Sequence, residues 1–233
     1  MAARGEDERV GCLSVVPTPI GNLEDITFRA LRMLREADMV LAEDTRTTGI
    51  LLKHYEIETK LYPFHLNNEH AVLDRFVQQL VDGARVALVS DAGTPGISDP
   101  GFLLIREAIR RGVEVTCLPG PTALIPALVG SGLPCDRFVF EGFLPVKKGR
   151  RTRIAAVAQS ERTVVLYESP HRLVRLLHEL QEEVGESRRV CVAREISKVY
   201  ETYVRGTVGE VLEEYGEGEV RGECVVIVEG KSE

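Results

Sequence analysis

Several common sequence features are missing from this chain. No run of about 18 apolar residues could span a bilayer, and the polar residues 1–10 lack the apolar stretch of a signal peptide. We therefore expect a soluble protein of the cytoplasm. The five cysteines include no Cys-x-x-Cys pair, which argues against a zinc site or redox chemistry, so we expect reduced thiols and no bound metal.

The usual nucleotide-binding motifs and a basic overall charge are also missing. Neither Gly-Lys-Ser/Thr nor Gly-x-Gly-x-x-Gly occurs in the chain. With 29 basic and 36 acidic residues, the net charge is −7, which argues against broad electrostatic binding to nucleic acid. One basic cluster stands out against this background, although such a run can also be a merely solvated helix start. It consists of Lys147, Lys148, Arg150, Arg151 and Arg153.

Short apolar runs alternate with amphipathic stretches along the first half of the chain, which is typical of repeated βα units. The pattern predicts strands at 12–17, 39–42, 86–90 and 113–118, and helices at 27–37, 45–54, 69–81 and 101–111. A further helix is expected up to about residue 129. This order predicts a mostly parallel sheet that is covered by helices.

A second series of elements begins after the Gly-Leu-Pro turn at 132–134, so we expect two α/β domains, residues 1–132 and 133–233. The second series predicts strands at 137–140, 163–167, 190–193, 199–207 and 224–229, with helices at 149–160, 172–184 and 208–215. The last strands follow one another closely, which favours a mixed sheet. The sequence contains no internal repeat or low-complexity tract.

Ligands of open α/β sheets bind beyond the carboxyl ends of the strands, so the turns after the strands deserve most weight. The first predicted strand is followed by the Pro/Gly-rich loop 17–25, and the third is followed by 90–101, with glycines, hydroxyls and two carboxylates. Carboxylates would repel a phosphate, so this loop favours a ligand with hydroxyls, an amine or a sulfonium. As plain helix-capping turns, both segments would have no ligand.

Six segments carry a resemblance to a known family. They are 16–27, 42–46, 90–101, 118–123, 142–145 and 168–172, which read VPTPIGNLEDIT, AEDTR, SDAGTPGISDPG, LPGPTA, GFLP and ESPHR. Together they resemble the family of small-subunit ribosomal RNA methyltransferases I, within the tetrapyrrole-methylase superfamily. The chain departs from the expected pattern at 64–69, which lacks a second histidine, and has conservative changes at 193–198.

The resemblance implies an S-adenosylmethionine-dependent enzyme that methylates the 2′-hydroxyl of a cytidine ribose in 16S ribosomal RNA of the small subunit. It also implies a homodimer, with an active-site cleft between the two domains that holds the methyl donor. The implied donor-binding positions are Pro19, Ser90, Asp91, Ala92, Thr94, Ser98, Thr122 and Ala123 in the first domain, and Tyr167, Glu168 and Ile196 in the second.

Removing a proton from a ribose hydroxyl favours a positioned general base. The candidates are Asp44, His65, His171 and Lys198, which the sequence does not rank. Asp44 has the alternative of pairing with Arg46, and His171 that of simply beginning a helix. Contacts to RNA phosphates are expected from Arg46, Lys147, Lys148, Arg150, Arg151, Arg153 and Arg172.

Two other functions fit parts of this pattern. A small-molecule methyltransferase acting on a tetrapyrrole precursor would share the fold and the donor loops, but the basic segment and the full TPIGN and ESPHR motifs argue for RNA. A non-catalytic RNA-binding assembly protein would keep the fold with a degenerate cleft, and would not bind S-adenosylmethionine.

Overall fold

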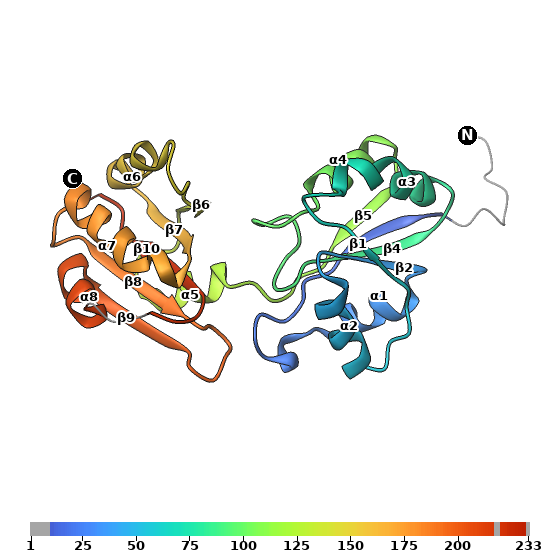
Figure 1. Cartoon of the computed structure of the whole chain (residues 1–233), viewed down its shortest axis with the longest axis horizontal. Helices are drawn as coiled ribbons and strands as arrows, with labels where there is room; N and C mark the ends of the chain where they lie inside the picture. The colour runs from blue at the N-terminus through green and yellow to red at the C-terminus, as the bar shows by residue number, and fades with distance from the viewer. Residues whose placement is uncertain (1–9, 217–219, 232–233) are drawn as a thin grey trace. The chain divides into compact units, whose positions relative to one another are not determined.

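The chain forms two compact units, Met1–Thr122 and Ala123–Glu233. The computed structural model describes residues 10–216 and 220–231 of them, so that most of the polar start lies outside the described residues (Figure 1). Each unit contains a five-stranded sheet with helices packed on it, which confirms the expected pair of α/β domains. Within the described residues, no helix is both long and apolar enough to cross a membrane.

The sheet of the first unit is entirely parallel, with strand order β3-β2-β4-β1-β5. Two of the middle strands contain continuous apolar runs, at 39–42 and 86–89, as is usual where both faces of a sheet are covered. Its strands are β1 (Cys12–Val15), β2 (Met39–Ala42), β3 (Leu61–Pro63), β4 (Arg85–Val89) and β5 (Glu114–Cys117).

Two pairs of helices cover the two faces of this sheet. Leu41 and Leu88 pack with α3 (Glu69–Val81) and α4 (Phe102–Arg110). The alternating residues Val40, Ala87 and Val89 pack with α1 (Phe28–Glu36) and α2 (Thr45–His54) on the opposite face. Successive side chains of a strand point to opposite faces, so one apolar run supplies both cores.

The two central strands of the first sheet send the chain in opposite directions. The connection after β1 runs through α1 to β2, which lies beyond β4 in the sheet. The connection after β4 runs through α4 to β5, which lies beyond β1, in the opposite direction. Neighbouring strands with diverging connections leave a crevice at their carboxyl ends, where α/β proteins bind ligands. The fold therefore directs attention to the loops that follow β1 and β4.

The sheet of the second unit is mixed, as the closely spaced strands predict. Its order is β6-β7-β10-β8-β9; β6 and β7 are parallel, and the other pairs are antiparallel. The strands are β6 (Phe138–Phe143), β7 (Thr163–Glu168), β8 (Arg189–Arg194), β9 (Thr202–Thr207) and β10 (Cys224–Val228). The core of this unit involves α6 (Arg150–Gln159), α7 (Pro170–Val184) and α8 (Val208–Tyr215).

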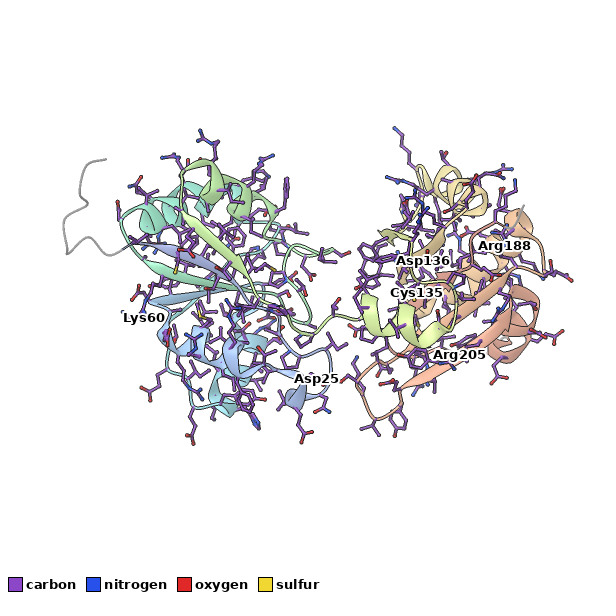
Figure 2. The ribbon with its side chains drawn as sticks, turned by 180° about the vertical axis from the view of Figure 1, so that it is seen from behind. Asp25, Lys60, Cys135, Asp136, Arg188 and Arg205 are labelled. Atoms are coloured by element: carbon purple, nitrogen blue, oxygen red, sulfur yellow. The ribbon has the colours of Figure 1, made fainter. Side chains whose placement is uncertain are left out.

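Helix α5 (Leu124–Ser131) belongs to the second unit, so the division falls after Thr122 rather than after residue 132 as the sequence suggests. Arg205 of β9 donates to the Gly130 carbonyl, and Figure 2 shows this arginine beside α5. A Cβ atom at Gly130 would lie 2.6 Å from the Tyr203 ring. This close packing ties α5 to the second sheet, which a boundary placed by turn residues does not foresee.

Candidate functional site

The loops after β1, β4 and β5 are fastened to one another at the carboxyl edge of the first sheet. Thr18 and Gly93 exchange backbone hydrogen bonds of 2.9 Å, and the buried Thr18 hydroxyl donates to the Ser90 carbonyl at 3.0 Å. The Thr94 hydroxyl donates to the Pro121 carbonyl at 3.2 Å. Three loops far apart in sequence therefore form one surface, as the crevice at the strand ends requires.

The loop after β4 has a backbone that favours glycine at several positions. Gly93 and Gly101 have φ angles of 79° and 137°, and a Cβ atom at Gly101 would lie 2.9 Å from the Leu88 side chain. Ser98 also has a positive φ, 65°, which is rare for a residue with a side chain. Such conformations persist where surrounding structure enforces them, and they gather at ligand sites.

A cavity of about 300 Å³ lies in the first unit, between the loop after β1 and helix α2. Pro19, Ser90 and Asp91, all expected to bind the methyl donor, are among its lining residues. The cavity combines apolar side chains, such as Leu51, with hydroxyls and one carboxylate. The full lining is Thr18, Pro19, Gly21, Leu23, Thr47, Thr48, Ile50, Leu51, His54, Ser90 and Asp91.

The expected donor residues of the first unit occupy different environments. Ser90 is buried, and its hydroxyl donates to the carbonyls of Ala92 and Gly93, so it shapes the loop. The side chains of Asp91, Ala92 and Ser98 are exposed in the same loop, and Thr94 is half-buried. Thr122 and Ala123 lie at the division between the units, where Ala123 rather than a hydroxyl residue precedes α5.

Asp44 is committed to local structure. It caps α2, and its carboxylate forms an ion pair with Arg46 at 2.6 Å. The hydrogen bonds from Arg46 lower the pKa of Asp44 to about 2. The backbone N–H of Asp44 also donates to Asp91 at 3.0 Å, which connects the end of β2 to the loop after β4. A carboxylate of such low pKa is a weak proton acceptor, so the pairing alternative fits Asp44 better than the role of base.

Glu43, which the sequence did not single out, is a better placed carboxylate. It directly follows β2, and burial and then the neighbouring Asp91 raise its pKa above the ordinary value. The charge of His65 acts on this pKa in the opposite direction, as the smallest contribution. The Nδ1 atom of His65 is buried with no hydrogen-bond partner in the described structure. The AEDTR motif contains both carboxylates, but only the folded chain shows that Asp44 is paired with Arg46 and that desolvation raises the pKa of Glu43.

In the second unit, Glu168 is the centre of a buried ion network. Its side chain is 0% exposed and accepts from Arg150 at 3.2 Å and from Arg172 at 2.7 Å. Arg150, 3% exposed, also bonds Glu179 at 2.7 Å. Arg150 is therefore buried and is not the surface phosphate contact that the basic run suggested. The sequence of five basic residues does not indicate that one of them, Arg150, is buried and paired with two carboxylates.

The other members of the basic run lie on the surface. Lys147 and Lys148 are exposed, and the Arg151 side chain is 94% exposed. Arg153 is also exposed but forms an ion pair with Glu141 at 2.9 Å. The surface of this segment therefore stays positive although Arg150 is buried. Lys147 and Lys148 are its clearest cations, because Arg151 lies 3.9 Å from Glu183. Arg46 in the first unit is 89% exposed.

Lys198 lies in the turn between β8 and β9. Its ammonium pairs with Glu195 at 2.8 Å and with Glu223 at 3.0 Å. Burial alone would lower the pKa of Lys198, but the hydrogen bonds that its ammonium donates to these carboxylates, together with their charges, outweigh burial and raise the pKa. A lysine that holds its proton more firmly is poorly suited as a base. Ile196, 9% exposed, sits between Glu195 and Ser197, both with positive φ.

The remaining expected residues are Tyr167 and His171. Tyr167 is the last but one residue of β7, before Glu168; it is half-buried and has aromatic neighbours on β6. His171 is exposed in the first turn of α7, which starts at Pro170. Among residues 10–216 and 220–231, no three His, Cys, Asp or Glu side chains gather as a metal site would require.

Comparison with known proteins gives consistent results. The family model described as "Tetrapyrrole (Corrin/Porphyrin) Methylases" matches residues 13–212. "Ribosomal RNA small subunit methyltransferase I" of Escherichia coli O157:H7 is 49% identical over 227 residues, covering 96% of this chain and 79% of the relative. The protein of the same name from Thermotoga maritima is 45% identical, covering 95% and 100%.

Among solved structures, the chain resembles uroporphyrin-III C-methyltransferase from Thermus thermophilus in complex with S-adenyl homocysteine. The TM-score is 0.63 at 24% sequence identity, and the match covers 94% of this chain and 97% of that one. At this level of identity, the similarity establishes the shared fold of two α/β domains.

Proposed function

The chain belongs to the family of tetrapyrrole (corrin/porphyrin) methylases, and on this premise we propose that it methylates small-subunit ribosomal RNA. The methyl donor is S-adenosylmethionine, and the acceptor is the 2′-hydroxyl of a cytidine ribose in 16S RNA. The observation that carries the proposal is the identity of 45–50% over nearly the whole chain to relatives named as methyltransferases of this RNA.

The loops of the first unit fit a donor with a sulfonium, an amine and ribose hydroxyls. Asp91 presents an exposed carboxylate, of which one oxygen accepts from the Asp44 N–H. Carboxylates favour cations and hydroxyls over phosphates. Ser90, Thr94 and Thr18 keep the loop rigid by hydrogen bonds to backbone carbonyls. Bound S-adenosylmethionine supplies an electrophilic methyl group, and these residues orient it.

Rigid orientation supplies a large share of the rate in an in-line methyl transfer. Holding two reactants in line contributes about 7–11 kcal/mol in favourable cases. The cross-linked loops after β1, β4 and β5 are suited to this role because their hydrogen bonds are already made without a ligand. The chain therefore needs a fixed donor site more than a covalent nucleophile.

Glu43 and His65 are the strongest candidates for taking the hydroxyl proton. Burial and Asp91 raise the pKa of Glu43, which brings this carboxyl closer to the range where a base is effective at neutral pH. The buried, unpaired Nδ1 of His65 leaves its ring available for a proton relay. Asp44 and Lys198 are disfavoured by their ion pairs, and His171 keeps its candidacy as an exposed residue.

RNA contacts are assigned to exposed cations. In the second unit these are Lys147, Lys148 and Arg151, whose partner Glu183 is 3.9 Å away; Arg153 and Arg172 are weakened by closer carboxylate partners. Arg46 plays the same part in the first unit, where it is exposed but weakened by its ion pair with Asp44. Phosphate contacts position the substrate without reading its sequence, so the target nucleotide is chosen by other contacts. For a ribosomal substrate we expect the enzyme to act in the cytoplasm, and we expect a homodimer.

The decisive experiment combines this protein with small ribosomal subunits that lack the modification and with labelled donor. Mass spectrometry of nuclease fragments should find one methyl group on a cytidine ribose. The next phosphodiester should resist alkali, because alkaline cleavage requires a free 2′-hydroxyl. Methyl transfer to a tetrapyrrole precursor but not to subunits would favour the small-molecule function, and subunit binding without donor binding would favour an assembly protein.

A further inference from the structure

Phe143 is an exposed aromatic side chain at the end of β6. It is 54% exposed, although a phenylalanine is usually buried. Strand β6 is an edge of the second sheet, next to β7 (Figure 1). The fold therefore presents a large apolar ring to solvent at a strand end, immediately before the basic segment.

A bulge in β6 determines where this ring points. Phe140 pairs with Val165 and Phe143 pairs with Tyr167, so three steps along β6 match two steps along β7. Without the extra residue, Phe140 and Phe143 would lie on opposite faces of the sheet. The bulge, with Gly142 at a φ of 62°, places both rings on the face of Tyr167. Bulges of this kind re-aim side chains next to functional sites.

The three rings form a cluster that supports Phe143. The ring of Tyr167 contacts Phe140 and Phe143 in edge arrangements, with centroids 5.0 and 5.6 Å apart. Edge contacts of this type are favourable for aromatic pairs and restrict the rings. Phe143 is thus held from one side by Tyr167, while about half of its surface remains exposed.

The residues that follow Phe143 are held by core packing and by a hydrogen bond from Arg150. Leu144 is buried in the core of the second unit, and the Pro145 carbonyl accepts from the Arg150 guanidinium at 3.3 Å. Arg150 is in turn held by the buried Glu168 and by Glu179. This network explains why a basic residue of the run is buried: it fixes the loop and leaves Lys147 and Lys148 exposed.

A fixed, exposed aromatic ring beside exposed lysines matches the chemistry that binds unpaired nucleotides. Bases stack on aromatic side chains, and lysines contact the neighbouring phosphates. We infer that Phe143, supported by Tyr167, is a stacking surface for an unpaired base of the RNA substrate, and that Arg150 positions it. This inference rests on the proposed function.

The test compares substitutions at Phe143 in methylation of small subunits. Phe143→Ala should raise the KM for subunits by about five- to 150-fold, the loss expected for one stacked base. Phe143→Leu keeps an apolar side chain but not a ring, and should behave like the alanine variant. Phe143→Tyr should restore the wild-type KM. The matched control is Phe28→Ala, since Phe28 is 93% exposed in the first unit and should leave the KM unchanged.

Salt dependence separates stacking from charge. The double variant Lys147→Ala/Lys148→Ala should reduce the slope of log affinity against log salt by about 2, whereas Phe143→Ala should leave the slope unchanged. Arg150→Met should raise the KM like Phe143→Ala, and Arg150→Lys should restore part of it. A full rescue of KM by Phe143→Leu would overturn the inference, because simple burial would then suffice.

Two further outcomes would also overturn it. Weaker binding of S-adenosylmethionine to Phe143→Ala, measured by calorimetry, would assign the ring to the donor. A change in the molar mass of this variant in solution would assign the ring to an interface between copies of the chain. If wild-type protein methylates no RNA, the proposed function itself fails, which is distinct from an active wild type whose KM is indifferent to Phe143.

Discussion

Two loops that follow strand ends are stabilised in different ways in the two units. The loop after β4 is fixed by hydroxyls and backbone groups, such as Thr18 on the Ser90 carbonyl. The loop after β6 is fixed by buried ions, with Arg150 held by Glu168 and bonded to Pro145. Because the loop after β4 is held by neutral hydrogen bonds, its carboxylates stay available to a ligand. In the loop after β6, the charges of Arg150 and Glu168 are used to hold the loop itself.

This difference has an energetic consequence. A neutral hydrogen bond contributes about 0.5–1.5 kcal/mol, and its loss leaves at most one unsatisfied group. A buried ion pair contributes little relative to apolar packing, but removing one partner leaves an uncompensated charge. A single substitution among the hydrogen bonds of the loop after β4 should therefore lower the free energy of unfolding only a little. A single substitution in the ion network of the second unit should lower it more.

The largest effect is expected from Glu168→Ala. The variant removes a fully buried carboxylate from Arg150 and Arg172. Breaking a buried pair costs about 3–5 kcal/mol, and the lower end applies here because Glu179 still bonds Arg150. Urea denaturation of the full chain measures this loss. Glu107→Ala is the matched control, since its partners Arg110 and Arg111 are solvent-exposed, and stability should change little. If Glu168→Ala and Glu107→Ala lost the same free energy of unfolding, burial would not make the ion network of the second unit more costly to break.

A smaller effect is expected from Thr18→Val in the first unit. The change deletes the hydroxyl that donates to the Ser90 carbonyl, for a loss of about 1–3 kcal/mol that does not vary with pH or salt. Donor affinity should fall as well, because the loops after β1 and β4 lose a link. Thr59→Val removes a comparable bond to the Leu34 carbonyl. Thr59→Val should lower stability without changing the donor affinity measured by calorimetry. If Thr59→Val lowered donor affinity as much as Thr18→Val, the local role of Thr18 would be refuted.

The smallest effect is expected from Glu43→Gln. Because the pKa of Glu43 is raised in the folded chain, its protonated form is favoured by folding, and the benefit is lost as pH rises through that pKa. The neutral glutamine should therefore raise Tm slightly at pH 7, by less than about 4 °C, and the difference should vanish below the ordinary pKa of 4.5.

The kinetic side of the same variant tests the proposed base. If Glu43 accepts the proton, kcat at pH 7 should fall although the protein is more stable. Asp44→Asn is the comparison, since Asp44 is held by Arg46. A variant Glu43→Gln that is both more stable and fully active would show that this carboxyl takes no part in the reaction.

The sequence predicts elements well where periodicity is strong. Helices α2 and α3 and strand β2 have the predicted bounds, because apolar positions repeat over whole turns or a whole strand. Strand β3 is missed, since three residues ending in proline show no period. The predicted strand at 199–207 begins only at Thr202, because Lys198 and its carboxylate partners form a turn.

The site divides in the same way. Motif spacing identifies the loops after β1, β4 and β5, because the carboxyl ends of parallel strands share an edge. The partners of individual side chains could not be predicted from the sequence. Arg150 and Glu168 are 18 residues apart and lie on different elements, so their buried pairing requires the folded chain. The same applies to the burial that raises the pKa of Glu43 beside the low-pKa Asp44.

The most direct test of the central claim, that the strand-end loops of the first unit hold the methyl donor, is a calorimetric titration with S-adenosylmethionine. Wild-type protein and the control Asp74→Ala, changed on an exposed part of α3, should bind with the same affinity. Asp91→Ala should bind about tenfold more weakly or worse, the loss of one charge-assisted hydrogen bond. Undiminished binding by Asp91→Ala, or no binding by the wild type, would contradict the account.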